Sequence, residues 1–276
     1  MYRQIKVAAI SAKPRKWDKP GNADKLEQFF RRASRTKADL IVAPEAMLDG
    51  YVAMEVIGDA QKAAAMRELA EPINGPCIKR FQKLAGQLGR CLVFGFTERS
   101  GRNLYNTAIF LDQRGRVCGR HRKTHLYEGS DATWWFNRIG RTLRAFDTPF
   151  GRAGMIICAE RWNPDIARAL VLDGAQMLII PSFGDRSKAQ NETVLARARE
   201  NGVPIVEASV GVNMIVSKGE MVAYKWGADE ITTATIDIPF PPSARAARKA
   251  ERAYLKWQGP EMSRRYRRTM KRVGKI

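Results

Sequence analysis

The sequence feature that most constrains the fold is a short stretch in which an apolar strand leads through one cysteine to a helix start. Residues 153–165 read A-G-M-I-I-C-A-E-R-W-N-P-D, and the apolar run at 154–157 is long enough for one buried strand. Asn163, Pro164 and Asp165 then predict a helix, because they supply a capping side chain, a first-turn proline and a first-turn acid. We therefore expect Cys158 to lie on a sharp turn between the two elements.

A cysteine in this position has two interpretations. Unpaired backbone N–H groups at a helix start favour a thiolate and can bind an oxyanion, so Cys158 could act as a nucleophile. A lone buried thiol is more often structural, and on this stretch alone the structural interpretation is slightly favoured.

Strand patterns alternate with helix patterns along most of the chain, with hairpins between some of the strands. This order predicts an α/β domain with a mixed sheet. A proline-rich segment at 239–242 marks the expected end of its core. The predicted strands lie at 5–12, 39–43, 91–97, 104–112, 116–120, 142–146, 152–158, 177–181, 205–209, 213–222 (a hairpin) and 231–238, and the predicted helices at 24–35, 60–69, 78–88, 164–174 and 191–201.

Composition narrows the class of protein. The 276 residues are 45% apolar, enough for a substantial core in one domain. No apolar run approaches the ~20 residues of a membrane span, and the apolar part of the start is too short for a signal peptide, so we expect a cytoplasmic protein without membrane association. The four cysteines are widely spaced and there are only two histidines, so no ordinary zinc site is predicted.

The net charge of +20 is concentrated near the end of the sequence. Residues 243–276 contain twelve Lys or Arg and two Glu, and so supply half of the excess positive charge. We expect a domain at 1–242 followed by a basic extension at 243–276, which either belongs to that domain or serves as an assembly arm. A solvated helix that pairs with acids of a sister subunit is favoured. Nucleic-acid binding is the alternative, although no aromatic-and-basic nucleic-acid module is present.

Three residues far apart in the chain lie at or just after the end of a predicted strand or hairpin: Glu45, Lys123 and Cys158. Each alone is a weak signal, since an acid after a strand is usually a loop residue and Lys123 lies among other cations. Together they could attack an amide or nitrile carbon. The thiol needs a base, the developing oxyanion needs a cation, and the hydrolytic water needs the base again.

Four blocks of sequence resemble those of the nitrilase, or carbon–nitrogen hydrolase, superfamily, in order as well as in content. They are P-E-A-M-L-D-G-Y (44–51), N-L-Y-N-T-A-I-F-L-D (103–112), G-R-H-R-K-T-H-L (119–126) and G-M-I-I-C-A-E-R-W-N-P-D (154–165). The resemblance runs from the first strand to about residue 238. It implies a four-layer αββα sandwich with mixed sheets.

The same resemblance implies a Glu–Lys–Cys triad. Glu45 would be the general base, and Cys158 the nucleophile that forms a thioester. Lys123, helped by the backbone N–H of Ala159, would stabilise the tetrahedral oxyanion. This chemistry requires no metal and no organic cofactor.

The sequence departs from the family pattern at a second acid. Many members carry another glutamate shortly before the glycine that corresponds to Gly140. Thr133 stands near that position, so Glu128 is the nearest replacement and Asp131 a weaker one.

Other departures concern substrate recognition. Family members often have an aromatic residue and an Asp after the cysteine, where Ala159 and Glu160 stand here. Carboxylate-recognising members place an arginine at the position of Trp162, and the neighbouring Arg161 could compensate or face outward.

Two further residues are candidates for the substrate pocket. Trp134 lies in an irregular aromatic segment, and Tyr51 follows a turn after Glu45. Both have packing as the competing interpretation, and for Tyr51 packing is slightly favoured.

These features predict a hydrolase of a non-peptide C–N bond in a small linear amide or carbamoyl compound. It would act through a thioester, release ammonia or an amine, and assemble as a homodimer or higher homo-oligomer. The Trp-Glu pair typical of nitrilases is absent after the cysteine, which favours amides over nitriles. The alternatives are a nitrilase or acyltransferase with the same triad, or a weakly active scaffold whose basic tail binds nucleic acid.

Overall fold

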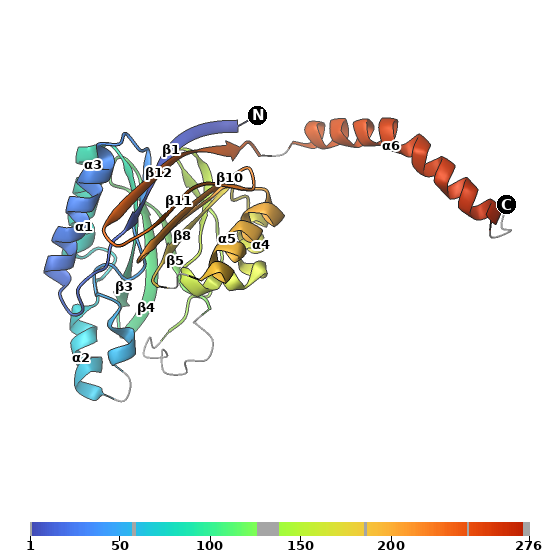
Figure 1. The fold of residues 1–276 in the computed structure, drawn as a ribbon. Helices are drawn as coiled ribbons and strands as arrows, with labels where there is room; N and C mark the ends of the chain where they lie inside the picture. The colour runs from blue at the N-terminus through green and yellow to red at the C-terminus, as the bar shows by residue number, and fades with distance from the viewer. Residues whose placement is uncertain (1, 57–58, 126–137, 185–186, 242, 273–276) are drawn as a thin grey trace. The chain divides into compact units, whose positions relative to one another are not determined.

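The computed structural model describes the chain apart from residues 1, 57–58, 126–137, 185–186, 242 and 273–276 (Figure 1). The chain divides into two compact units, Met1–Pro239 and Phe240–Ile276. The first unit contains two β-sheets and their covering helices, and the second contains one long helix.

The first sheet has six strands in the order β12-β1-β2-β3-β4-β5. Its central pairs, β1 with β2 and β2 with β3, are parallel, and the remaining pairs are antiparallel, so the sheet is mixed. The strands are β1 (Tyr2–Ser11), β2 (Leu40–Val42), β3 (Cys91–Ser100), β4 (Asn103–Leu111), β5 (Val117–Arg122) and β12 (Glu230–Pro239).

The second sheet also has six strands, in the order β11-β10-β9-β8-β7-β6. Its parallel pairs, β7 with β8 and β8 with β9, are again central. The strands are β6 (Phe146–Thr148), β7 (Gly151–Met155), β8 (Met177–Ser182), β9 (Ile205–Ser209), β10 (Val212–Ser217) and β11 (Glu220–Trp226).

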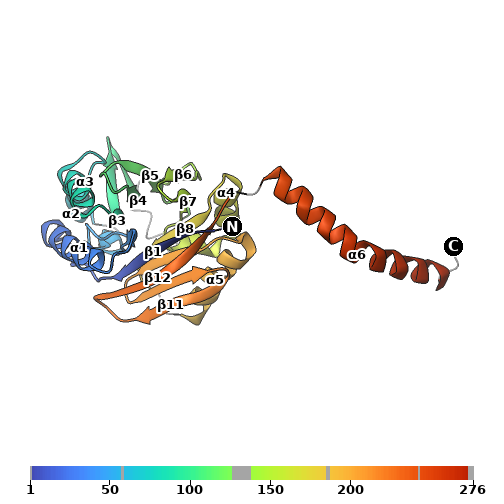
Figure 2. The same cartoon turned by 90° about the horizontal axis from the view of Figure 1, so that it is seen from above.

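Helices cover the outer face of each sheet, which gives four layers (Figure 2). The helices on the first sheet are α1 (Lys19–Ser34) and α3 (Pro76–Leu88), and those on the second are α4 (Pro164–Leu172) and α5 (Lys188–Asn201). The other helices among the described residues of this unit are α2 (Ala60–Leu69) and the short 3₁₀ helices η1 (Val52–Glu55) and η3 (Cys158–Trp162).

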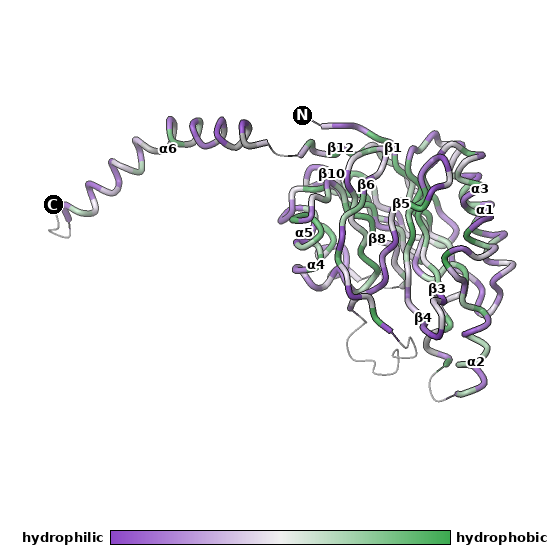
Figure 3. The backbone as a smooth tube through the Cα atoms, turned by 180° about the vertical axis from the view of Figure 1, so that it is seen from behind, coloured by the Kyte–Doolittle hydropathy of each residue, from purple (hydrophilic) through white to green (hydrophobic). Residues whose placement is uncertain are grey.

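Alternation along the strands explains why the layers form. On β1, Val7 and Ala9 face the core between the sheets, while Ala8 and Ile10 face the core under α1 and α3. Side chains of successive residues in a strand point to opposite faces, so a fully apolar strand must be covered on both sides. In Figure 3 the inner strands are mostly green, whereas the outer helices alternate between purple and green along their length.

The predicted αββα sandwich with mixed sheets is confirmed. The predicted helix at 60–69 and the strand at 205–209 have the observed bounds, and most other elements differ by a few residues at their ends. The strand predicted at 142–146 is wrong. The strand begins at Phe146 instead, because the turn at Pro149 and Phe150 closes a hairpin of only three pairs, in which Phe146 opposes Ala153.

The second unit consists mainly of α6 (Ala244–Arg272), which contains Pro260. Its described side chains are almost all exposed, including Leu255 and Tyr266. That this basic extension forms an assembly arm stays a prediction. Among the residues described, no helix combines the length and the apolar character needed to cross a bilayer.

Candidate active site

Glu45 lies just after β2, in a segment that backbone hydrogen bonds hold against β3. Gly95 N donates to the Pro44 oxygen at 3.0 Å, and Met47 N donates to the Gly95 oxygen at 2.8 Å. Gly95 permits this approach, because a Cβ atom there would lie 2.6 Å from the Glu45 Cα. Glu45 N donates to the carbonyl of Ser182, at the end of β8, at 3.2 Å. Both sheets therefore fix the backbone of Glu45.

Lys123 follows the last residue of β5, and its side chain reaches Glu45. The Lys123 Nζ donates to Glu45 Oε1 at 2.8 Å, and both side chains are buried. Asn106 Nδ2 donates to the same oxygen at 2.6 Å. The second oxygen, Glu45 Oε2, is buried and has no hydrogen-bond partner among the residues described. Buried polar atoms are normally partnered, so Oε2 is an exception that needs an explanation.

The electrostatic surroundings keep Lys123 charged. Burial lowers the pKa of Lys123, but the charges of Glu45 and Cys158 and the hydrogen bond to Glu45 raise the pKa by more, so its net direction is upward. Lys123 is therefore a cation at neutral pH. The influence of Cys158 on this pKa also means that the thiol lies near the ammonium group.

Cys158 occupies the sharp turn that the sequence predicts. It begins η3 with φ of +48°, in the left-handed region that residues other than glycine seldom adopt. Downstream the predicted helix start is confirmed, with Asn163 capping α4 and Pro164 as its first residue. The Cys158 Sγ lies 3.8 Å from the carbonyl oxygen of Phe183 and 3.8 Å from Nη2 of Arg161. The strained turn thus holds the thiol beside the end of β8.

Tyr51 lies close to both Glu45 and Cys158. Its ring stacks on Phe183, with centroids 4.3 Å apart and planes 9° from parallel. The charge of Glu45, then burial, then the charge of Cys158 raise the pKa of the Tyr51 hydroxyl well above its usual value. The hydroxyl therefore stays protonated and can donate a hydrogen bond. Its role in substrate binding stays a prediction.

Glu160 connects the cysteine turn to the segment that carries Lys123. Its carboxylate accepts from Ile157 N at 2.7 Å, and from Thr124 N and Thr124 Oγ1 at 2.6 Å each. His121 Nε2 lies 2.7 Å from Oε2, the oxygen that also accepts from Ile157 N, while Thr124 bonds to Oε1. Burial raises the pKa of Glu160, but His121 and these hydrogen bonds lower the pKa by more, to about 2. The ionised Glu160 therefore links β5 to the turn that carries Cys158.

The sequence analysis did not predict this structural role of Glu160. It registered Glu160 only as a departure from the family pattern, without assigning it a role. The available signal was an acid placed three residues after Ile157, where its side chain can bond back to the backbone N–H at the start of the turn.

Arg161 is buried and points inward. Its Nη1 donates to Ser182 Oγ at 2.9 Å and forms an ion pair with Glu207. Trp162 is 40% exposed, and Ala159 is buried in the first turn of η3, where backbone N–H groups lack partners within the helix. Arg161 therefore supports the cysteine turn. The substrate-binding roles of Arg161 and Trp162, and the oxyanion role of Ala159, stay predictions.

The remaining candidates lie outside the described residues. They are Glu128, proposed as the replacement for the second glutamate, its weaker competitor Asp131, the neighbouring Thr133, and Trp134, proposed for the substrate pocket.

Comparisons with known proteins agree with this fold. The carbon–nitrogen hydrolase family model matches residues 6–245. The chain is 28% identical over 214 residues to a bifunctional nitrilase/nitrile hydratase of Lupinus angustifolius, which covers 74% of this chain and 61% of that protein. It is 29% identical over 198 residues to an N-carbamoylputrescine amidase of Oryza sativa subsp. japonica, over 70% of this chain and 62% of that protein. The chain thus spans about three fifths of the length of these relatives.

A solved structure shows the same architecture. The amidase from Nesterenkonia sp. AN1, determined in complex with acrylamide, superposes with a TM-score of 0.71 at 20% sequence identity, covering 95% of this chain and 97% of that one. At this identity the likeness shows the fold. Because the family model covers most of the sequence, the protein belongs to the carbon–nitrogen hydrolase family of the nitrilase superfamily.

Proposed function

We propose that the protein hydrolyses a non-peptide C–N bond in a small linear amide or carbamoyl compound, with Glu45, Lys123 and Cys158 as the catalytic residues. The observation that supports this most is the buried pair of Glu45 and Lys123 beside a strained cysteine, with Glu45 Oε2 left without a partner among the described residues. Perturbed ionisable groups around a nucleophile are characteristic of active sites.

The first half of the reaction makes a thioester. Glu45 Oε2 takes the thiol proton of Cys158, and the sulfur attacks the substrate carbonyl carbon. Lys123 and the backbone N–H of Ala159 stabilise the resulting oxyanion. The protonated Glu45 then gives its proton to the leaving nitrogen. The C–N bond breaks, ammonia or an amine departs, and an acyl group remains on sulfur.

The second half restores the enzyme. Glu45 takes a proton from water, and the hydroxide oxygen attacks the thioester carbonyl. The C–S bond breaks as the tetrahedral intermediate collapses, a carboxylic or carbamic acid leaves, and Cys158 regains a proton from Glu45. Every proton removed is returned, so the cycle needs no external oxidant, reductant or metal.

The substrate class follows from the sequence and from the relatives together. An N-carbamoylputrescine amidase is among the relatives, which is a precedent for a linear carbamoyl compound. Nitrilases are relatives as well, but this sequence has Ala159 and Glu160 after the cysteine instead of the Trp-Glu pair typical of nitrilases. Amides are therefore favoured over nitriles. A homo-oligomeric assembly is part of the proposal.

The experiment that tests this is intact mass spectrometry of the protein after incubation with a panel of amides, carbamoyl compounds and nitriles. We expect an acyl adduct on Cys158 and release of ammonia or amine. Cys158→Ala should abolish both, with a loss of activity of at least about 10⁴-fold.

Cys118→Ala is the matched control, because Cys118 is a free and similarly half-buried thiol on β5. It should keep the adduct and the activity. Full amide hydrolysis by Cys158→Ala would overturn the proposal. An adduct that is transferred to added amines faster than to water would favour the acyltransferase alternative.

A further inference from the structure

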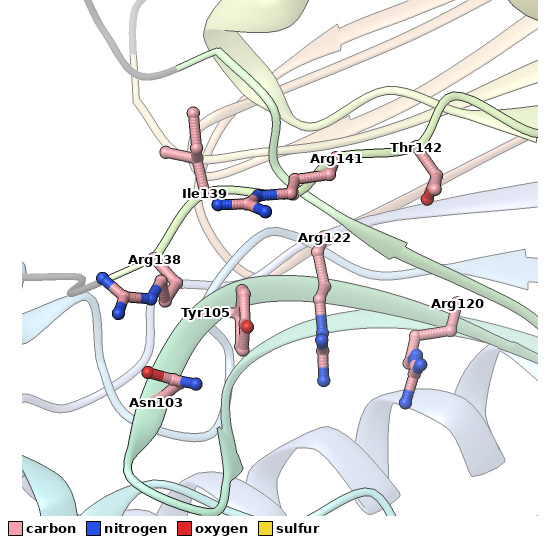
Figure 4. A pocket seen from close by; sticks show the side chains of 9 residues that line it. Asn103, Tyr105, Arg120, Arg122, Arg138, Ile139, Arg141 and Thr142 are labelled. Atoms are coloured by element: carbon pink, nitrogen blue, oxygen red, sulfur yellow. The ribbon is translucent and has the colours of Figure 1, made fainter.

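A cavity of about 460 Å³ lies against β4 and β5, away from the proposed active site (Figure 4). Four of the residues that line it are arginines, which project from two separate segments of chain. They are Arg120 and Arg122 on β5, and Arg138 and Arg141 on the segment that returns past it.

Strand alternation places this cavity on the opposite face of β5 from the catalytic residues. Arg120 and Arg122 are two residues apart and so share one face of β5. His121, between them, faces the other way and bonds to Glu160. Tyr105 on β4 lies on the arginine side, with the Arg122 guanidinium 3.7 Å above its ring centroid. A ligand in the cavity would therefore not contact Cys158.

Among the described residues, Glu98 is the acid that pairs with both arginines of β5. Glu98 is buried and accepts from Arg122 Nε at 3.0 Å and Nη2 at 2.6 Å, while Arg120 Nη1 lies 3.4 Å away. One carboxylate thus serves two guanidinium groups and fixes their positions. Each guanidinium has five N–H donors, so both keep donors that can point into the cavity.

The second segment that lines the cavity packs against the end of β5 at a glycine. Gly140 N donates to the Lys123 carbonyl at 2.8 Å, and a Cβ atom at this glycine would lie 1.9 Å from the Arg122 carbonyl oxygen. This approach carries Arg138 and Arg141 over β4 and β5, where both are exposed (Figure 4). Guanidinium groups from both segments therefore line one cavity.

We propose that this cavity binds a phosphoryl-bearing anion, such as an organic phosphate or diphosphate ester. Planar guanidinium groups recognise phosphate oxygens through paired N–H donors, and several around one volume match a multiply charged group better than a single carboxylate. The volume holds more than a bare phosphate ion, and the Asn103 amide and the Tyr105 ring border the remaining space. This site stands independently of the proposed hydrolase chemistry.

The test is isothermal titration calorimetry of the full chain with inorganic phosphate, inorganic pyrophosphate, adenosine diphosphate and citrate. We expect one site per chain that prefers the phosphoryl compounds over citrate. Arg138→Ala combined with Arg141→Ala should weaken binding by about a hundredfold, roughly tenfold for each lost charge-assisted contact. Both side chains are exposed, so the double variant should fold.

Two control variants separate the cavity from general positive charge. Arg168→Ala removes an exposed arginine of α4, and Arg267→Ala removes one from the basic α6. Each should bind within about twofold of the parent at ~0.15 M salt. Pyrophosphate alone binding tightly would identify an inorganic ligand, and tighter binding of adenosine diphosphate an organic ester. The proposal fails if no phosphoryl compound binds the parent, or if the double variant binds as well as the two controls.

Discussion

Two buried glutamates a short distance apart, Glu45 and Glu160, have opposite surroundings. Glu160 accepts hydrogen bonds from two residues and pairs with His121, so that each of its oxygens has a partner. Glu45 receives two donors on Oε1, while Oε2 has none among the described residues. Buried polar atoms are normally partnered, so the fully bonded Glu160 fits a structural role, whereas Oε2 of Glu45 needs an explanation that the proposed role as a base supplies.

The two acids also differ in the electrostatic effect of their partners. Glu160 is held ionised, with a pKa lowered to about 2, by partners that cannot leave without opening the turn at Cys158. Glu45 shares its charge with Lys123, whose own pKa is raised by this contact. Glu160 fixes the turn that carries Cys158, and in the proposed mechanism Glu45 exchanges protons with that thiol. Substitutions at these two positions should therefore fail in different ways.

Of the substitutions at these two acids, the one at Glu45 has the larger expected effect on catalysis. Glu45→Gln removes the proton acceptor with little change of shape, and we expect kcat to fall by about 10²–10⁴, the usual contribution of a general base. The measurement is steady-state release of ammonia or amine, with intact mass spectrometry to show that no acyl adduct accumulates.

Glu192→Gln is the matched control for this prediction, because Glu192 is a mostly exposed acid on α5 that pairs with Lys188. It should leave kcat unchanged. Retention of more than about a tenth of the parent activity by Glu45→Gln would contradict the role of Glu45 as base.

Glu160→Gln should act on stability first. The substitution places an amide where a buried carboxylate accepts hydrogen bonds from Thr124 and Ile157. Leaving buried donors without a charged acceptor costs about 1–3 kcal/mol or more, and we expect the free energy of unfolding at pH 7 to fall by about 3 kcal/mol. In the parent, the pKa of Glu160 is depressed from 4.5 to about 2 on folding. Its contribution is therefore fully present above pH ~4.5 and is lost as the pH falls toward ~2.

Urea unfolding at a series of acid pH values checks this prediction. The parent should lose stability steeply through that window, and Glu160→Gln should have a shallower slope there. Equal slopes in the two proteins would mean that Glu160 is not the group that titrates.

The fold was largely predictable from sequence because its signals are local. The strand at 205–209 and the helix at 60–69 are defined by apolar pattern and by flanking residues such as Asp59, whose side chain caps α2. The turn at Cys158 was predictable for the same reason, since Asn163 and Pro164 mark the following helix. The short hairpin starting at Phe146 was misjudged because apolar residues upstream of it continue the strand pattern.

Contacts between distant residues were the part that sequence could not give. Glu160 meets His121 and Thr124 across 36 or more positions, and Arg161 meets Glu207 across 46. Nothing in the residue types alone indicates that Arg161 turns inward to an ion pair. The arginine cavity is a similar case, because residues of β5 line it together with residues 138–142, and only the folded chain brings these two segments together.

The smallest expected effect is on Tyr51, which tests how far the chemical role extends beyond Glu45. Tyr51→Phe keeps the ring that stacks on Phe183 and removes only the hydroxyl. Because the raised pKa keeps this hydroxyl neutral, it can donate one uncharged hydrogen bond, and its loss should lower kcat/KM by about tenfold or less. The pH–rate profile should keep its shape, since a group that stays protonated does not titrate in the working range.

Tyr224→Phe is the matched control. It loses a hydroxyl bonded to Asn191 at 2.9 Å and should leave the rate unchanged. If Tyr51→Phe instead abolished activity as fully as Glu45→Gln, the tyrosine would take part in the proton transfer. Glu45 alone would then not explain that transfer.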